Sequence, residues 1–227
     1  MTAKKKQVQK KRKYVRKETK VHPKAVICYC PQVCPDVMQV QLRYAVPKNA
    51  SGGGIGAISD FVFRGNSPFD PDFAIGGQQP MGYDQWSNFY RRYRVLASKV
   101  IVMANANSNE PSGVGIVANN TSSAFISREQ AREQQYGKSI VLGSRDGSQS
   151  GTLTQYVSTA QVRGGPSDIV QYEQDLSALV TANPDQQFFW HIYGWGTGLV
   201  PNSFDVSMQI EIVYYIQFYD RETLVRS

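Results

Sequence analysis

Apolar and polar residues alternate at both ends of the main body of this chain, in the pattern of β-strands with one buried face. In residues 37–44 the apolar positions are Met38, Val40, Leu42 and Tyr44. In residues 204–219 they are Val206, Met208, Ile210, Ile212, Tyr214, Ile216 and Phe218. At about 3.3 Å per residue the second strand would be about 50 Å long, more than twice the typical length.

Six further strands are predicted between these two, at residues 55–63, 94–103, 114–118, 139–142, 152–158 and 188–193. Pro47 and the glycines of residues 51–54 predict a loop after the first strand. The turn-forming residues 110–113 predict a hairpin that joins the third and fourth strands. Residues 65–82 are expected to form a long excursion, and residues 160–184 a loop with at most one helical turn.

Two short helices are also predicted. Asp84 can cap the first, whose buried stripe at helical spacing would be Trp86, Phe89, Tyr90 and Tyr93. The capping-box pattern Ser127 to Gln130, with Gly137 as the C-terminal cap, predicts the second helix at residues 128–136. Eight strands with long corner loops predict an all-β fold: a single jelly roll of two four-stranded antiparallel sheets, over residues 35–227.

The first 24 residues have a charge unlike that of the remainder. They hold 11 basic residues and one acidic residue, a formal charge of +10, whereas the remaining 14 basic and 17 acidic residues give −3. A stretch this charged cannot bury enough apolar surface to offset its ordering entropy, so residues 1–34 are predicted to be a disordered basic arm and its junction.

A phosphate backbone is the partner that such an arm is expected to bind, because each neutralised phosphate releases a counterion. The predicted nucleic-acid-binding residues are Lys4, Lys5, Lys6, Lys10, Lys11, Arg12, Lys13, Arg16, Lys17, Lys20 and Lys24. A nuclear localisation signal, a ribosomal-type extension and a membrane-surface patch are the alternatives. Nuclear import is compatible with nucleic-acid binding. A membrane patch is disfavoured because the arm has few apolar residues and no lipidation signal.

Cys28, Cys30 and Cys34 cluster where the arm meets the body. With His22 they could supply four zinc ligands, but their spacing matches no standard zinc finger and His22 lies in the arm. An odd, tightly clustered set is also not a disulfide framework. We therefore predict free thiols and no bound metal.

Candidate catalytic residues are sparse. His191 alternates with aromatic residues in a predicted strand, where a packed, hydrogen-bonded histidine is expected. Gly52, Gly54 and Ala57 fit a dinucleotide-binding pattern but precede a strand, the reverse of the required context. Ser148 and Ser150 do not occupy the nucleophile position of an α/β-hydrolase turn. The sequence therefore predicts no enzymatic activity and no cofactor.

Two further groups could bind ions or nucleic acid. Asp70 and Asp72 could contribute to a calcium site between subunits, but two acids in a proline-rich loop are usually solvated. A basic island of Arg91, Arg92, Arg94 and Lys99 surrounds Tyr90 and Tyr93, so bases could stack there while the cations hold phosphates. We favour the alternative in which the tyrosines are core and the cations form a solvated or subunit-contact face.

No apolar run approaches the length of a membrane span, and the charged N-terminus lacks a signal-peptide core. The chain is therefore expected to be soluble and not inserted in a membrane.

One segment resembles a known family. Residues 81–100, with the basic arm before them and the long strand at the end of the chain, resemble capsid proteins of small circular Rep-encoding single-stranded DNA viruses, the circovirus-like group. The residues that match are Gly82, Tyr83, Asp84, Gln85, Trp86, Tyr90, Tyr93, Arg94, Val95, Ser98 and Lys99.

The resemblance implies a jelly roll that assembles as about 60 copies into an icosahedral T=1 shell, with the arm facing inward on single-stranded DNA. It also implies a virion protein that passes through the host nucleus, with the nuclear import machinery and an unidentified host receptor as partners. A capsid protein of a small single-stranded RNA or satellite virus is the first alternative, since fold alone does not separate the cargoes. A cellular nucleic-acid-binding β protein is the second, but it would leave the elaborate loops and the acidic body unexplained.

Overall fold

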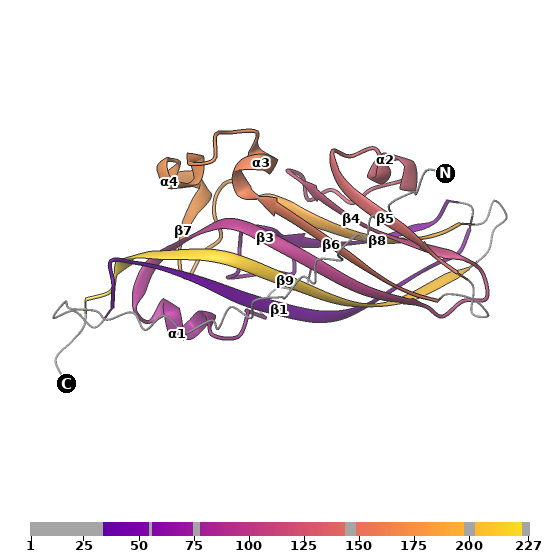
Figure 1. Cartoon of the computed structure of the whole chain (residues 1–227), viewed down its shortest axis with the longest axis horizontal. Helices are drawn as coiled ribbons and strands as arrows, with labels where there is room; N and C mark the ends of the chain where they lie inside the picture. The colour runs from indigo at the N-terminus through magenta and orange to yellow at the C-terminus, as the bar shows by residue number, and fades with distance from the viewer. Residues whose placement is uncertain (1–33, 55, 75–77, 144–148, 198–202, 224–227) are drawn as a thin grey trace, which may run out of the picture. The chain divides into compact units, whose positions relative to one another are not determined.

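The computed structural model describes residues 34–54, 56–74, 78–143, 149–197 and 203–223 (Figure 1). Within these ranges nine strands form two antiparallel sheets, so the predicted all-β jelly roll is confirmed. Among the same residues, no helix combines the length and apolarity needed to cross a membrane.

The larger sheet, here called the β3–β9 sheet, has the strand order β1–β9–β3–β6, and the short strand β7 pairs with the beginning of β3. Its strands are β1 (Val37–Gly52), β3 (Tyr90–Ala106), β6 (Ser150–Ser158), β7 (Ser177–Leu179) and β9 (Phe204–Arg221). The β4–β8 sheet has the order β2–β8–β4–β5. It contains β2 (Ile58–Arg64), β4 (Ser112–Asn119), β5 (Tyr136–Leu142) and β8 (Phe189–Gly196). Eight strands match the predicted ones, and the short β7 is an addition.

The core lies between the two sheets, and β9 runs through the middle of the larger one. The alternating apolar residues of β9 are at most 2% exposed, as the pattern predicted. Trp190 of β8 is fully buried, and its indole Nε1 donates to Ser98 Oγ of β3 at 2.7 Å. A buried side-chain hydrogen bond therefore joins the two sheets.

The predicted aromatic helix is wrong beyond its first turn. Helix α1 covers only Tyr83–Ser87, and β3 begins at Tyr90. Tyr90 and Tyr93 are fully buried because both rings pack against Phe218 of β9, at centroid distances of 6.0 and 6.5 Å. A bulge between Val95 and Ala97 then shifts the register of β3 against β9. The bulge changes which alternate residues face the core, and so disguises the strand period in the sequence.

Two other expectations about connections are wrong. Pro47 does not begin a loop but lies within β1, opposite Gln209 of β9. β1 is an edge strand, where a proline nitrogen needs no ladder partner. The predicted hairpin of the third and fourth strands does not form, since β3 and β4 belong to different sheets.

Residues 159–176 are more ordered than the predicted loop. They form α3 (Thr159–Arg163), α4 (Ile169–Tyr172) and a 3-10 turn, η1 (Gln174–Leu176). A capping box of Ser158 and Gln161 starts α3, and Gly164, at a positive φ of 72°, ends it.

Helix α2 (Arg128–Arg132) begins as predicted, with Ser127 Oγ accepting from Gln130 N. It ends before Gly137, because Gly137 belongs to β5 and pairs with Val117 of β4. The predicted C-terminal cap at Gly137 is therefore wrong.

Candidate nucleic-acid interface

The basic arm lies outside the described residues. This holds for the predicted binding residues Lys4, Lys5, Lys6, Lys10, Lys11, Arg12, Lys13, Arg16, Lys17, Lys20 and Lys24, and for His22, Cys28 and Cys30. Their roles, and the absence of zinc, stay predictions. Cys34 is a half-buried free cysteine that packs against the core.

The described body begins next to the end of β9. Tyr90 Oη donates to the carbonyl oxygen of Pro35 at 2.9 Å, and Arg221 Nη2 lies 2.8 Å from Asp36 Oδ1. Val37, the first residue of β1, pairs with Tyr219. The first described residues therefore lie at the end of the β3–β9 sheet that also holds the basic island.

The structure divides the basic island according to the partners of each side chain. Arg91 is exposed and forms two hydrogen bonds with the carboxylate of Glu222, at 2.8 and 3.0 Å. Arg92 and Arg94 lie on the outward face of β3, opposite Tyr219 and Gln217. Lys99 follows on the same face, after the bulge. Because Tyr90 and Tyr93 are core, the first half of the favoured interpretation is confirmed, and bases cannot stack on these two rings.

The outward face of the β3–β9 sheet is richer in cations than the body as a whole. The strand registers place Arg43, Arg92, Arg94 and Lys99 on this face, against the carboxylates of Glu211 and Asp205. The sequence outside the arm has a net charge of −3. A cationic face on an acidic body is the charge distribution expected of a surface that meets a polyanion.

The outward face of the β4–β8 sheet is covered by the chain itself. Phe125 and Ala131, from the connection between β4 and β5, pack with Val117, Tyr193 and Trp195 in a second apolar cluster. The cationic face of the β3–β9 sheet is covered at one end, where α4 and η1 pack over Leu96 of β3.

His191 is packed and hydrogen-bonded, as predicted. It is fully buried, with Nδ1 2.8 Å from Asp60 Oδ2 and Nε2 donating to the carbonyl oxygen of Thr121 at 2.8 Å. The Phe125 ring lies against it, at a centroid distance of 4.7 Å. Both ring nitrogens are thus engaged by groups of the chain, which leaves none to accept a proton from a substrate.

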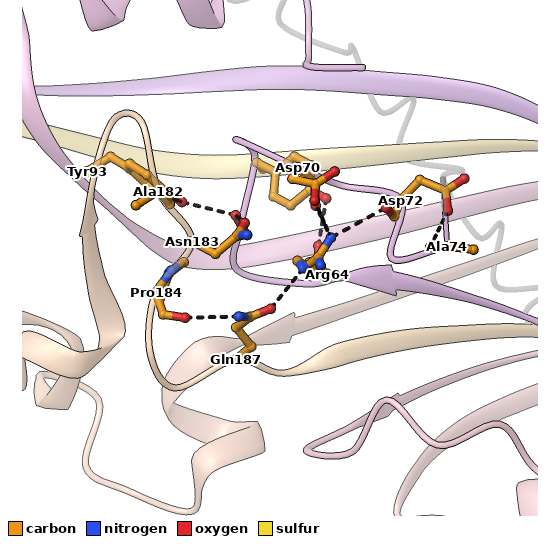
Figure 2. Close-up of polar contacts among 11 residues, drawn as sticks. Arg64, Asp70, Asp72, Ala74, Tyr93, Ala182, Asn183, Pro184 and Gln187 are labelled. Carbon is orange, nitrogen blue, oxygen red and sulfur yellow. Dashed lines mark hydrogen bonds and ion pairs between the residues drawn. The ribbon is translucent and has the colours of Figure 1, made fainter. Parts of the chain in front are cut away.

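Asp70 and Asp72 are paired with basic side chains, so the expectation that they are solvated is wrong. Figure 2 shows Asp70 against Arg64, whose Nη1 donates to Oδ2 at 2.7 Å. Asp72 Oδ2 accepts from Lys48 Nζ at 2.7 Å. A calcium ion would have to displace these cations. No group of three or more histidine, cysteine, aspartate or glutamate side chains in the described part of the chain could hold a metal.

Arg64 also links two excursions that are far apart in sequence. Its Nε donates to Gln187 Oε1 at 3.0 Å (Figure 2). Its guanidinium also lies 4.9 Å from the centre of the Phe73 ring. The role of Arg64 was not predicted from the sequence, because its partners are distant in the chain and are brought together only when the two sheets pack. The buried partner of Lys48 could have been predicted from the sequence. Lys48 interrupts the inward-facing series Leu42, Tyr44, Val46 and Ala50, and a cation at such a position needs a buried partner.

Comparison with known proteins identifies the fold. No protein-family model and no curated protein sequence matches the chain. The tobacco necrosis virus structure aligns with a TM-score of 0.51 over 84% of this chain and 85% of that chain, at 12% identity. The cucumber leaf spot virus structure aligns with a TM-score of 0.50 over 86% of this chain and 54% of that chain, at 11% identity. Neither name is that of a Rep-encoding single-stranded DNA virus, so the narrower resemblance of residues 81–100 stays a prediction. Over its described residues, the chain has the jelly-roll fold of viral capsid proteins.

Proposed function

We propose that this protein is a viral capsid protein that self-assembles into a closed shell and packages single-stranded nucleic acid through its basic N-terminal arm. The fold carries the proposal, because a jelly roll aligned over most of its length with a viral structure is a shell-building architecture. The charge division supports the second part: the arm has +10 and the rest of the chain −3. The body would associate with copies of itself while the arm neutralises the genome.

Two kinds of genome fit this proposal. The resemblance of residues 81–100 favours single-stranded DNA, with assembly in the host nucleus and an arm that doubles as an import signal. The fold is shared with small icosahedral RNA viruses, so it supports an RNA genome at least as well. In either case the protein forms the icosahedral shell of the virion, and the resemblance of residues 81–100 adds the expectation of about 60 copies.

Electron microscopy of the purified full chain tests shell formation, with closed particles of uniform size as the expected result. Nuclease digestion before and after disruption of the particles then identifies the cargo. RNase sensitivity after disruption would favour the RNA genome, and DNase sensitivity the DNA genome. Protein that stays monomeric under all assembly conditions would overturn the proposal.

Removing the arm tests its role in packaging. Deletion of residues 1–24 should lower the 260/280 nm absorbance ratio of purified particles to that of protein alone. A matched variant keeps the arm at full length but replaces its 11 basic residues with glutamine, and it should lose the same nucleic acid if charge is responsible. About 60 arms of charge +10 would bring roughly 600 positive charges to the genome, so cargo binding should weaken steeply with salt. An unchanged absorbance ratio in both variants would show that the arm does not bind the cargo.

Limited trypsin digestion tests on which side of the shell the arm lies. The 11 Lys and Arg residues before Ala25 make an accessible, disordered arm an easy substrate. Intact particles should keep the arm during brief digestion, whereas subunits dissociated by salt should lose it in the same time. Equal rates in the two states would place the arm outside and contradict inward packaging.

A further inference from the structure

A cavity of about 390 Å³ opens beside the basic island, between the outward face of the β3–β9 sheet and the segment from α4 to η1. Arg92, Arg94, Ser177 and Tyr219 line it from strands of this sheet, and Tyr172 lines it from α4. Figure 1 shows α4 and β7 together at this end of the molecule. The volume is within the range of cavities that bind small ligands.

Arg92 and Arg94 have only neutral hydrogen-bond partners among the described residues. Arg92 donates to Tyr219 Oη and to Ser177 Oγ, both at 3.3 Å. Arg94 donates to Gln217 Oε1 at 2.5 Å and to the carbonyl oxygen of Gln171 at 2.9 Å, and its guanidinium lies 4.7 Å from the centre of the Tyr219 ring. Several other arginines of the body pair with carboxylates: Arg43, Arg64, Arg91, Arg128 and Arg221.

Two half-buried guanidiniums in one cavity without a paired carboxylate favour an anion there. Glu173 and Asp220 also line the cavity, but both are exposed, so water and salt screen them more than they screen the arginines. The long contacts of Arg92 leave its donors free to turn toward a phosphate. Arginine also matches phosphate geometry through two parallel hydrogen bonds.

The surroundings favour a nucleic acid over a small inorganic anion. Tyr172 lies at the mouth of the cavity and is 77% exposed, a position in which a base can stack on its ring. The first strand of the body begins close to this cavity, since Val37 pairs in β9 with Tyr219, a lining residue.

We propose that this cavity binds single-stranded nucleic acid, with a backbone phosphate between Arg92 and Arg94 and a base stacked on Tyr172. The proposal rests on the packaging function proposed above and adds a contact from the folded body to that of the arm. Such a site fixes one nucleotide per subunit relative to the shell, whereas the arm holds the polymer by charge alone.

Photocrosslinking of the full chain tests the proposal. The probe is an oligonucleotide of about ten residues that contains 5-iodouracil, in an RNA and a DNA version. Cleavage after Asp168 and Glu173 releases the short peptide 169–173, which contains Tyr172 and can be identified by mass spectrometry. A crosslink in this peptide is expected. Crosslinks to the arm fall in other peptides and do not interfere.

Four variants separate the cavity from general charge. The double variant Arg92→Gln/Arg94→Gln should lower the crosslink yield in peptide 169–173 by about tenfold or more. Arg91→Gln removes a neighbouring cation that is paired with Glu222, and should leave the yield within about twofold. Tyr172→Phe changes an exposed residue, so it does not endanger folding. The phenylalanine ring can still stack on a base, so the crosslink in this peptide should be retained. In Tyr172→Ala, a several-fold higher concentration of unlabelled oligonucleotide should be needed to compete with the probe, because the base has no ring to stack on.

The outcomes separate this inference from the packaging function. Particles that hold nuclease-protected nucleic acid but give no crosslink in peptide 169–173 would overturn the cavity proposal and leave packaging intact. Equal crosslink yields in the Arg92/Arg94 and Arg91 variants would overturn it as well. If the arginine double variant cannot form shells while the wild type gives no crosslink, the cavity is a contact between subunits and the proposal is wrong. Failure of the wild type to form particles or to bind any nucleic acid would contradict the packaging function itself.

Discussion

Replacing Lys48 by methionine is expected to lower the free energy of unfolding of the body by about 3 kcal/mol. Lys48 Nζ lies 2.7 Å from Asp72 Oδ2, and the two side chains are only 13% and 9% exposed. The pair joins β1 of one sheet to the loop after β2 of the other. Methionine keeps the aliphatic stem of the lysine but leaves the Asp72 carboxylate in a poorly hydrated position without its cation.

The magnitude follows from distance and burial. At 2.7 Å and an effective dielectric constant of about 20, Coulomb attraction between the two charges is about 6 kcal/mol, most of which offsets their desolvation. Removing one partner of a buried pair costs about 3–5 kcal/mol. The lower figure applies because the pair keeps some contact with water, and because Asp72 Oδ1 still accepts from Ala74 N at 3.0 Å.

Arg43→Met provides the matched control on the same strand. Arg43 Nη1 lies 3.2 Å from Glu211 Oε2, but the arginine side chain is 63% exposed, so its loss should change stability by no more than about 0.5 kcal/mol. Combining Lys48→Met with Asp72→Asn should recover part of the loss, because the buried charge is then removed as well.

Urea unfolding of unassembled protein, followed by tryptophan fluorescence, measures these differences without the contribution of subunit contacts. Equal destabilisation by Lys48→Met and Arg43→Met would refute the reasoning from burial. A double variant less stable than Lys48→Met alone would show that Asp72 is stabilised by groups other than the lysine.

Three further predictions concern the core. Ser98→Ala should cost about 1–3 kcal/mol, because it leaves the buried indole N–H of Trp190 without an acceptor, and urea unfolding with near-UV circular dichroism would detect it. Gly115→Ala should prevent folding, since a Cβ there would lie 2.2 Å from the Tyr193 ring, whereas Gly53→Ala meets nothing within 4 Å and should leave the soluble yield unchanged. Burial raises the pKa of Tyr193 from its ordinary value of 10 to about 12, so the folded state retains a proton that the unfolded state loses. The contribution of Tyr193 to stability should therefore be constant below pH 10 and be lost between pH 10 and 12, as ultraviolet titration combined with urea unfolding of the wild type and of Tyr193→Phe would show.

Strands with a regular period could be predicted from the sequence, and those whose period is interrupted could not. The alternation of β9 holds for its whole length because the strand is paired on both sides, with β1 and β3. In β3 the period is interrupted: Tyr90 and Tyr93 are both buried at a spacing of three, which also fits a helix, and a bulge follows between Val95 and Ala97. Pro47 concealed the second half of β1, since proline in a strand is acceptable only at a sheet edge and the edge position depends on the tertiary fold.

The candidate interface also has parts that can be predicted from the sequence and parts that cannot. The charge of the arm is local in sequence, and so is the basic island. The cavity, in contrast, requires Arg94 to meet Gln171, which is 77 residues away, and Tyr219, which is on another strand. The capping box at Ser158 and the glycine at the end of α3 are signals of an ordered segment that the loop prediction for residues 160–184 overlooked. Only the sheet register brings that segment against the arginines.

The proposed function requires two tasks of one small domain, and its two outward sheet faces differ. A shell protein must bind copies of itself and hold a polyanion, and a single cationic surface that did both would make assembly compete with cargo binding. Here the β4–β8 sheet is covered by its own connection, around Phe125, while the outward face of the β3–β9 sheet is cationic and is covered by α4 and η1 only at one end. The remaining surface of the body must then carry more than its share of the negative charge, because the body as a whole is −3. Subunit contacts made through that surface would be disfavoured by repulsion at low salt until the cationic face and the arm bind nucleic acid, which gives a physical reason for cargo to promote assembly.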